Sequence, residues 1–267
     1  MTGPGDIDEA SVDTRLFVGS VAKGLSLLSA IASARRPVSV SEAAELSGLD
    51  RSGAQRMLYT LRVLGFLRQD EASRRYLLAA RVLDLAHGFL QADVLRRVAL
   101  PFLDDLARRC EETVNLTELA GSDVVYVARF PSRHVVSVDL AIGTRLPTWC
   151  TAPGRAILSR LPIDMLERLV PPDPLTHPTP RTARRRRDVL FRIRRAARDG
   201  FAINDQETFI GDISVAAPVL DRAGHAIGAV NIAVPFPRWT QPRVVSDLAP
   251  LVVETARLVS RELGGTQ

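Results

Sequence analysis

The chain has 267 residues, of which 46% are hydrophobic and 24% charged, enough apolar material for two globular domains. Its two cysteines lack CxxC spacing and its four histidines are scattered, so we expect no disulfide framework, no metal and no cofactor. The N-terminus is polar and no run approaches ~18 apolar residues, so we expect neither an export signal nor a membrane anchor. A cytoplasmic protein is expected, and its net charge of +5 is compatible with a polyanionic partner.

The first predicted helix covers residues 20 to 34 and follows a polar stretch, residues 1 to 14, that we expect to be disordered. Ser20 is a residue type suited to cap this helix. Apolar side chains at helical spacing predict a buried stripe of Val21, Leu25, Leu28 and Ala32.

A second, short helix is predicted to begin at Ser41, a good N-cap residue. The acids Glu42 and Glu45 follow in its opening turns, where the helix dipole favours negative charge. Gly48 is predicted to end it, and the segment from Val38 to Val40 is predicted as a short strand before it.

The third helix is predicted to begin at Arg51 or Ser52 and to end at Val63, with Gly65 as a left-handed stop. Apolar residues at steps of three and four predict its buried face as Ala54, Met57, Leu58, Leu61 and Leu64. The opposite face is polar and basic, and such side chains read base edges or hold phosphates. The predicted DNA-binding residues there are Arg51, Ser52, Gln55, Arg56, Tyr59 and Arg62; a merely solvated face is the alternative.

A two-stranded hairpin is predicted next, with strands at residues 66–69 and 74–77 and a polar turn between them. Arg74 and Arg75 fall at its edge, the position of the wing in a winged helix-turn-helix, and we add both to the predicted DNA-binding residues. Residues 15–79 are therefore predicted to form a winged helix-turn-helix domain that binds double-stranded DNA.

Residues 80–93 are predicted as a linker helix to a second domain over residues 94–264. The surrounding sequence predicts two Ala/Leu-rich helices, at residues 78–90 and 94–111. Apolar side chains of the first helix form either a dimer seam or ordinary packing onto the second domain: Leu83, Leu85, Ala86 and Phe89.

The second domain is predicted as an antiparallel sheet with helices on it, a mixed α/β (α+β) fold of the GAF-like kind. The predicted strands are residues 114–120, 124–130, 135–140, 201–204, 213–220 and 226–234. The predicted helices are residues 162–170, 182–198 and 241–263. The arginine run from Arg184 to Arg187 is interpreted as a solvated helix face, with a DNA or subunit contact as the alternative.

Two strings resemble a known family, GTRLPTWCTAPGRAILSRLP from Gly143 and DGFAINDQETFIGDISVAAPVLDRAGHAIGAVNIAV from Asp199. With VAKGLSLLSAIA and LDRSGAQRMLYTLRVLGFL near the N-terminus, they resemble the isocitrate lyase regulator (IclR) family of bacterial transcription factors. Within that family they most resemble the branch that governs aromatic-acid catabolism. The resemblance implies a winged helix-turn-helix, a linker helix and an effector-binding domain for a small organic acid. It also implies dimers or tetramers on promoter DNA, acting as activators or repressors.

A helix start suited to a carboxylate is predicted at Thr151, an N-cap residue with Pro153 in the first turn. The resemblance implies further ligand contacts from strand residues across the pocket. The predicted effector-binding residues are Trp149, Cys150, Thr151, Ala152, Pro153, Asn204, Ser214, Asn231 and Ala233. Two departures from the family pattern are Pro153, which lacks an N–H donor, and Asp212, which adds a negative charge beside Ser214. Arg145 and Arg155 are candidate cations for an acidic ligand, with surface ion pairs as the alternative.

The leading hypothesis is a ligand-responsive transcriptional regulator that controls catabolism of an aromatic or related small organic acid. One alternative is an enzyme that uses Cys150 as a nucleophile on a small acid, although no partner His can be identified for it. The other alternative is a structural DNA-binding protein without an effector.

Overall fold

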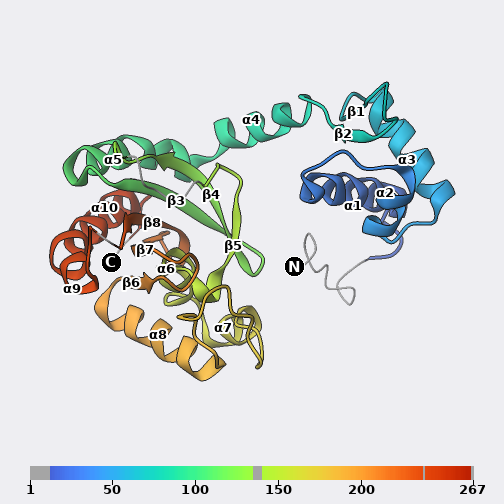
Figure 1. Cartoon of the computed structure of the whole chain (residues 1–267). Coiled ribbons are helices and arrows are strands. Elements are labelled where there is room, and N and C mark those ends of the chain that lie inside the picture. Colours follow the sequence, from blue (N-terminus) through green and yellow to red (C-terminus); the bar gives the residue numbers. More distant parts are fainter. Residues whose placement is uncertain (1–12, 135–139, 237, 266–267) are drawn as a thin grey trace. The chain divides into compact units, whose positions relative to one another are not determined.

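The computed structural model describes residues 13–134, 140–236 and 238–265, which belong to two compact units, one up to Ala92 and one from Asp93 onward (Figure 1). All but the last residue of the predicted strand at 135–140, and most of the predicted tail at 1–14, lie outside the described residues. Within the described ranges, no helix has the length and apolar composition needed to cross a membrane. In the same ranges, no three His, Cys, Asp or Glu side chains are grouped so as to hold a metal ion.

The first unit is a three-helix head with a two-stranded wing, followed by one further helix. Its core brings together apolar residues from all three helices and both strands: Leu27, Ile31, Val38, Ala43, Leu58, Leu61, Leu67 and Tyr76. The elements are α1 (Gly19–Ala34), α2 (Val40–Ser47), α3 (Arg51–Val63), β1 (Leu67–Gln69), β2 (Tyr76–Leu78) and α4 (Val82–Ala92). The winged helix-turn-helix prediction is therefore confirmed.

Helix α1 buries a different stripe from the one predicted. Leu27 and Ile31 are buried in the core, whereas Val21 and Leu25 are both 57% exposed. The helix is apolar on most sides in its second half, so spacing alone could not identify its inner face. Its N-cap is Val18, which makes no side-chain capping bond, and Ser20 lies inside the helix.

The cap of helix α2 lies two residues earlier than predicted, at Ser39 and not at Ser41. Ser39 Oγ accepts a hydrogen bond from the Glu42 N–H, and the Glu42 carboxylate accepts one from the Ser39 N–H at 2.8 Å, which completes a capping box. Val38 forms a single bridge with Tyr76 and not a strand of its own. Gly48 ends the helix in the left-handed conformation, as predicted.

Helix α3 has the predicted bounds, and its buried face is largely the predicted one. Asp50 caps it by accepting a hydrogen bond from the Gly53 N–H at 2.8 Å. Ala54, Leu58 and Leu61 are buried, but Leu64 is 48% exposed because it follows the last helical turn. The turn after it places Gly65 at a φ of 78°, as expected of a left-handed stop.

The wing is shorter than predicted. Strands β1 and β2 pair antiparallel, with Leu67 opposite Leu78 and Gln69 opposite Tyr76. Arg74 has a φ of 57°, so it belongs to the turn and not to the second strand. Since Leu78 ends the hairpin, the helix predicted from that residue begins only at Val82.

The second unit is built on a six-stranded antiparallel sheet with the strand order β5-β4-β3-β8-β7-β6, which confirms the predicted sheet. Its strands are β3 (Thr113–Ala120), β4 (Asp123–Phe130), β5 (Arg145–Pro147), β6 (Ala202–Asp205), β7 (Asp212–Leu220) and β8 (Ala226–Pro235). Its helices are α5 (Val94–Cys110), α6 (Ala152–Leu158), α7 (Ile163–Leu169), α8 (Arg186–Asp199), α9 (Gln241–Arg243) and α10 (Ala249–Glu262). A π-helical segment, Val244–Leu248, continues α9 into α10.

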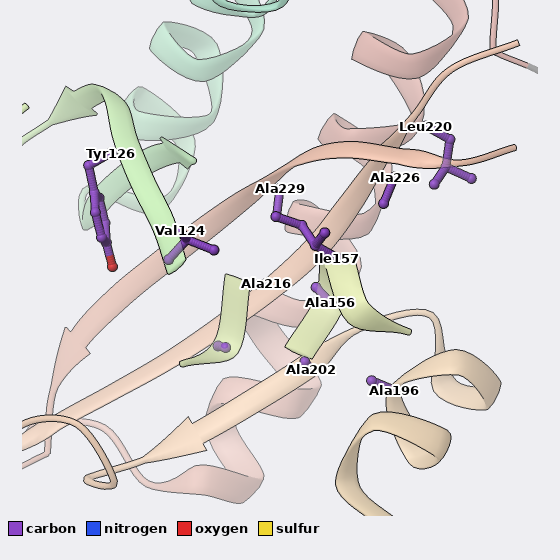
Figure 2. Packing of buried hydrophobic residues seen from close by; sticks show 11 residues of the cluster. Val124, Tyr126, Ala156, Ile157, Ala196, Ala202, Ala216, Leu220, Ala226 and Ala229 are labelled. Atoms are coloured by element: carbon purple, nitrogen blue, oxygen red, sulfur yellow. The ribbon is translucent and has the colours of Figure 1, made fainter. Parts of the chain in front are cut away.

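The two faces of this sheet have different covers. A Cβ atom on Gly228 would meet Leu95 of α5, so this face of β8 packs on α5, and α10 packs along β7 and β8. The alternate residues Ala216 and Ala229 face Ala156 and Ile157 of α6 (Figure 2). Because α6 is short, it covers only part of that face.

Helix α8 begins four residues later than predicted. The side chain of Thr182 donates a hydrogen bond to the Glu207 carbonyl at 2.6 Å, and that of Thr179 donates one to the Gln206 carbonyl at 2.7 Å. These bonds hold the preceding segment against the β6–β7 loop in a non-helical conformation. The helix therefore starts only at Arg186, whose N–H donates to Asp173 at 2.7 Å.

Candidate functional site

The predicted DNA-reading face of α3 points away from the core along its whole length. Its six residues are all exposed, and the core-facing side of the helix carries Ala54 and Leu58. The Arg62 guanidinium lies 5.6 Å from the centre of the Tyr59 ring, a cation–π contact that orders two of these side chains. The exposed residues are Arg51, Ser52, Gln55, Arg56, Tyr59 and Arg62.

The two predicted wing arginines have different environments. Arg74 is exposed at the tip of the hairpin turn. Arg75 instead forms an ion pair with Glu42 at 2.7 Å and donates a hydrogen bond to the Pro37 carbonyl at 3.2 Å. It therefore fastens the wing to the start of α2, while Arg68 on β1 is a further exposed cation that the sequence reasoning left out.

The second unit contains a cavity of about 310 Å³ over the sheet face that α6 covers only in part. Its floor is formed by side chains paired directly across neighbouring strands, which therefore point to the same side. One row runs across β6, β7, β8 and β3 and consists of Asn204, Ser214, Ala233 and Thr113. The next row runs across β4, β3 and β8 and consists of Arg129, Asn115 and Asn231. All the strand residues predicted to bind the effector thus meet on this floor.

A β-bulge on β4 turns both Tyr126 and Arg129 toward the cavity. Leu116 pairs with Ala128, whereas the next residue, Thr117, pairs with Tyr126, so β4 carries one extra residue at this point. In a regular strand, residues three apart face opposite sides of the sheet. Neither side chain was predicted, because an alternating pattern does not reveal a bulge.

Thr151 and Pro153 line the cavity from the start of α6. Thr151 caps the helix as predicted, since its Oγ1 accepts a hydrogen bond from the Gly154 N–H at 3.2 Å. Pro153 has no N–H, so this helix start offers few free donors to an anion. The charged donor among the described lining residues is Arg129, on β4.

The remaining predicted residues of this segment do not line the cavity. Trp149 and Cys150 pack in a separate apolar cluster with Leu158, and Ala152 packs against the sheet. Burial raises the pKa of the Cys150 thiol to about 12, so the sulfur is protonated near neutral pH. A protonated, buried thiol that is not among the lining residues of the cavity is poorly suited to the nucleophile role that the enzyme alternative gave it.

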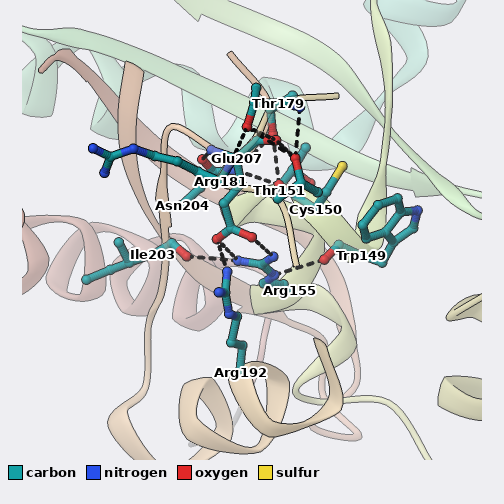
Figure 3. Close-up of polar contacts among 12 residues, drawn as sticks. Trp149, Cys150, Thr151, Arg155, Thr179, Arg181, Arg192, Ile203, Asn204 and Glu207 are labelled. Carbon is teal, nitrogen blue, oxygen red and sulfur yellow. Dashed lines mark hydrogen bonds and ion pairs between the residues drawn. The ribbon is translucent and has the colours of Figure 1, made fainter. Parts of the chain in front are cut away.

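Asn204 has its side-chain bonds within the protein. Its Nδ2 donates to the Cys150 carbonyl and to Thr208 Oγ1, and its Oδ1 accepts from the Glu207 N–H at 3.0 Å. These contacts join the segment before α6 to the β6–β7 loop (Figure 3). Asn204 is therefore a cavity wall residue that shapes the site more than a free hydrogen-bonding group for a ligand.

The two arginines predicted as candidate cations for the effector both form ion pairs with acidic residues of the protein. Arg155 is 1% exposed, pairs with Glu207 through its two terminal guanidinium nitrogens, and donates from Nε to the Trp149 carbonyl at 2.9 Å (Figure 3). Arg145 pairs with Asp123 at 3.3 Å on the far edge of the sheet. Arg155 is thus held in a buried ion pair and Arg145 in an exposed one, and neither lines the cavity.

The cavity also contains polar residues that are not among the predicted effector-binding residues. Asn115 accepts a hydrogen bond from Arg129 at 3.2 Å, while its Nδ2 and the Oδ1 of Asn231 are buried without hydrogen-bond partners among the described residues. An asparagine between two apolar residues, Val114 and Leu116, in a predicted strand was the available signal for Asn115. Asp212 also lines the cavity, and burial raises its pKa to about 7, an effect that the positive charge of Arg129 opposes. Burial raises the pKa of Tyr126 as well, with Asp212 contributing.

Models of two protein families match the chain. The family described as bacterial transcriptional regulator IclR C-terminal matches residues 87–261, and the IclR helix-turn-helix domain matches residues 20–71. Together they cover both units, so the match extends to the cavity and to the exposed face of α3.

Individual relatives agree with this assignment. The Pca regulon regulatory protein of Pseudomonas putida is 29% identical over 250 residues, which cover 93% of this chain and 85% of that protein. The crystal structure of Thermotoga maritima IclR matches with a TM-score of 0.69 and 25% identity over 92% of this chain and 99% of that one. A Microbacterium hydrocarbonoxydans IclR homologue, solved in complex with 4-hydroxybenzoate, has the same fold, with a TM-score of 0.75 at 21% identity over 92% of this chain and 99% of that one. This chain belongs to the IclR family of bacterial transcriptional regulators.

Proposed function

We propose that this regulator binds promoter DNA through the exposed face of α3 and the wing, and that it responds to a small organic acid held in the cavity of the second unit. The observation that carries the proposal is the polar cavity floor, where Arg129 lies in one row with Asn115 and Asn231. An arginine in one row with two amides is suited to a carboxylate, and the surrounding wall of Tyr126 and Phe209 is suited to an aromatic ring.

An aromatic carboxylate is the effector class that we propose. The Pseudomonas putida relative is named for its control of the Pca regulon, and the Microbacterium homologue was crystallised with 4-hydroxybenzoate. The cavity volume of about 310 Å³ falls at the small end of ligand pockets, which fits a single-ring acid.

Residues 80–93 are proposed to link a DNA-binding domain, 15–79, to an effector domain, 94–264, in a protein that acts in the cytoplasm as a dimer or tetramer. Helix α4, within this linker, exposes a group of apolar side chains, with Leu83 64%, Leu85 62% and Phe89 52% exposed. We propose that they pack against a second copy of the chain. Light scattering of the protein with Leu83 and Phe89 changed to Ser tests this, because loss of self-association is expected.

Footprinting on the upstream region of its own gene tests the DNA and effector roles together. Protection is expected, and its strength or extent should change when protocatechuate, 4-hydroxybenzoate, catechol, muconate or β-ketoadipate is added, because an effector that binds two states unequally shifts their balance. Absence of a protected site under every condition contradicts the proposal.

Substitution of Arg56 distinguishes contact with a base from contact with a phosphate. If Arg56 contacts a base, Arg56→Ala weakens binding to the protected site by about tenfold or more while binding to unrelated DNA changes little. If it contacts phosphate alone, both affinities fall together. Arg261→Ala, which removes one exposed charge from α10 in the other unit, is the charge-matched control and should leave both affinities unchanged.

A further inference from the structure

The side chain of Asp212 places a carboxyl group on the wall of the cavity that we assign to an acidic effector. It lies two residues before Ser214 on β7, so both side chains point to the same side of the sheet. Its backbone is fixed, because its N–H donates to the Phe209 carbonyl and its carbonyl accepts from the Gln206 N–H at 2.8 Å. Within the described part of the chain, burial and the charge of Arg129 are the influences on its carboxylate, with no hydrogen bond among them.

The charged and titratable groups around Asp212 are few. Arg129 and Tyr126 approach from β4, and both interact electrostatically with it. Glu112, just before β3, also lines the cavity, but its carboxylate is bonded to Arg238 and to the Trp239 indole N–H. From the β6–β7 loop, Gln206 is the neutral neighbour, and its Oε1 accepts from the Gly211 N–H.

This arrangement limits the charge that an effector can bring. Among the described lining residues Arg129 is the only cation. One guanidinium balances one carboxylate, so an ionised Asp212 together with an effector carboxylate would leave a net negative charge in a largely buried site. A protonated Asp212 removes that excess and becomes a hydrogen-bond donor.

We propose that Asp212 couples effector binding to proton uptake: its carboxyl group binds in the neutral form and donates a hydrogen bond to the carboxylate of the effector. The proposal rests on the effector role given to this cavity above. It makes Asp212 the residue that sets how the response of this regulator depends on pH. The raised pKa of Asp212, about 7, means that the proton is partly in place before the ligand arrives.

Proton release on binding is the opposite outcome, and the direction of proton exchange therefore decides between the two. An effector that donates a hydroxyl hydrogen bond to Asp212 would favour the ionised carboxylate and release a proton on binding. An effector carboxylate that accepts from Asp212 takes one up. The two cases differ in the direction of proton flow at the same site.

Calorimetric titration of the full-length protein with 4-hydroxybenzoate and with protocatechuate, between pH 6 and 8.5 in two buffers of different ionisation enthalpy, tests the proposal. Affinity is expected to fall by about tenfold per pH unit above neutrality, with uptake approaching one proton per site near pH 8. Asp212→Asn keeps a donor and removes the titration, so its affinity should be independent of pH and about thirtyfold tighter than that of the unchanged protein at pH 8.5.

Two further variants keep the test secure. Asp212→Ser should also give a flat pH profile, which guards against a folding defect peculiar to the Asn variant. Asp205→Asn removes a nearby carboxylate that pairs with Arg181 and does not line the cavity, so it should keep the pH dependence of the unchanged protein.

The possible failures are distinguishable. Binding that is independent of pH, or that releases a proton, overturns the role of Asp212 and leaves the proposed effector class standing. Absence of binding by either acid to every variant at every pH overturns the aromatic-acid assignment, and the coupling with it.

Discussion

Arg155 and Glu207 form a two-pronged ion pair inside the second unit, with both nitrogen–oxygen distances at 2.6 Å. Their side chains are 1% and 5% exposed, and Arg192 from α8 reaches the same carboxylate (Figure 3). The pair connects α6, whose start lines the cavity, to the β6–β7 loop, which forms another wall. Integrity of the effector cavity is therefore expected to depend on two residues that do not line it.

Removing one partner of this pair should be far more damaging than removing an exposed one. Glu207→Gln leaves a buried guanidinium without its counter-charge, so a loss of about 3–5 kcal/mol in the free energy of unfolding is expected. Arg168→Gln, which breaks the exposed pair with Asp164, should cost less than about 0.5 kcal/mol. Urea unfolding of both variants measures the difference; equal losses would contradict the assigned role of the buried pair.

Two glycines in helices should respond to alanine in opposite directions. A Cβ atom at Gly154 would lie 2.2 Å from the Thr148 carbonyl oxygen, so Gly154→Ala is expected to destabilise the second unit by about 2 kcal/mol or more. Gly88, in α4, has nothing within 4 Å of such an atom, so Gly88→Ala should stabilise the first unit by about 0.5–1 kcal/mol. Thermal unfolding, with each unit followed separately, gives both values.

The acid stability of the first unit should depend on Glu42. Hydrogen bonds from the Ser39 N–H and side chain, together with Arg36, lower the pKa of Glu42 to about 2 from the ordinary 4.5. A lowered pKa means that its stabilising contribution is complete above 4.5 and is lost as the pH falls toward 2. Glu42→Gln should flatten the melting temperature of this unit across that window. Glu45→Gln, an exposed acid on the same helix, should retain the slope of the unchanged protein.

Glu118 should have the opposite effect in the second unit. Burial and the neighbouring Asp93 raise its pKa to about 8, so the folded state holds a proton that the unfolded state has already lost. Stability should therefore fall as the pH rises from about 4.5 toward 8, and Glu118→Gln should reduce that decline. Melting temperatures between pH 5 and 9 measure it. Glu254→Gln, at an exposed position on α10, serves as the control; a decline unchanged in Glu118→Gln would contradict the assignment.

Local sequence determined the elements and the exposed reading face of α3. Four features act within one or two turns of chain and could be predicted from neighbouring residues. They are the apolar spacing of α3, the helix stops at Gly48 and Gly65, and the helix cap at Thr151. Prediction failed where neighbours were ambiguous, as in α1, which is apolar on most sides, and at Ser39 and Ser41, which are both good caps.

The cavity could be predicted only in part. Ser214, Asn231 and Ala233 were identified, but Arg129, Asn115 and Asp212 were not given a place in the site. Arg129 reaches the cavity because of a β-bulge, and the row it forms with Asn115 and Asn231 depends on pairing between strands more than 100 residues apart in the chain.

The sequence by itself determined most of the helices and strands, and that one helix face carries arginine and glutamine into solvent. Tertiary structure alone decided the use of each charged residue: Arg155 became a buried support, Arg75 a link between wing and helix, and Arg129 the cation of the cavity. The reason is physical. Helix and strand preferences arise from interactions within a few residues, whereas the environment of a charge is set by partners brought together when the sheet forms.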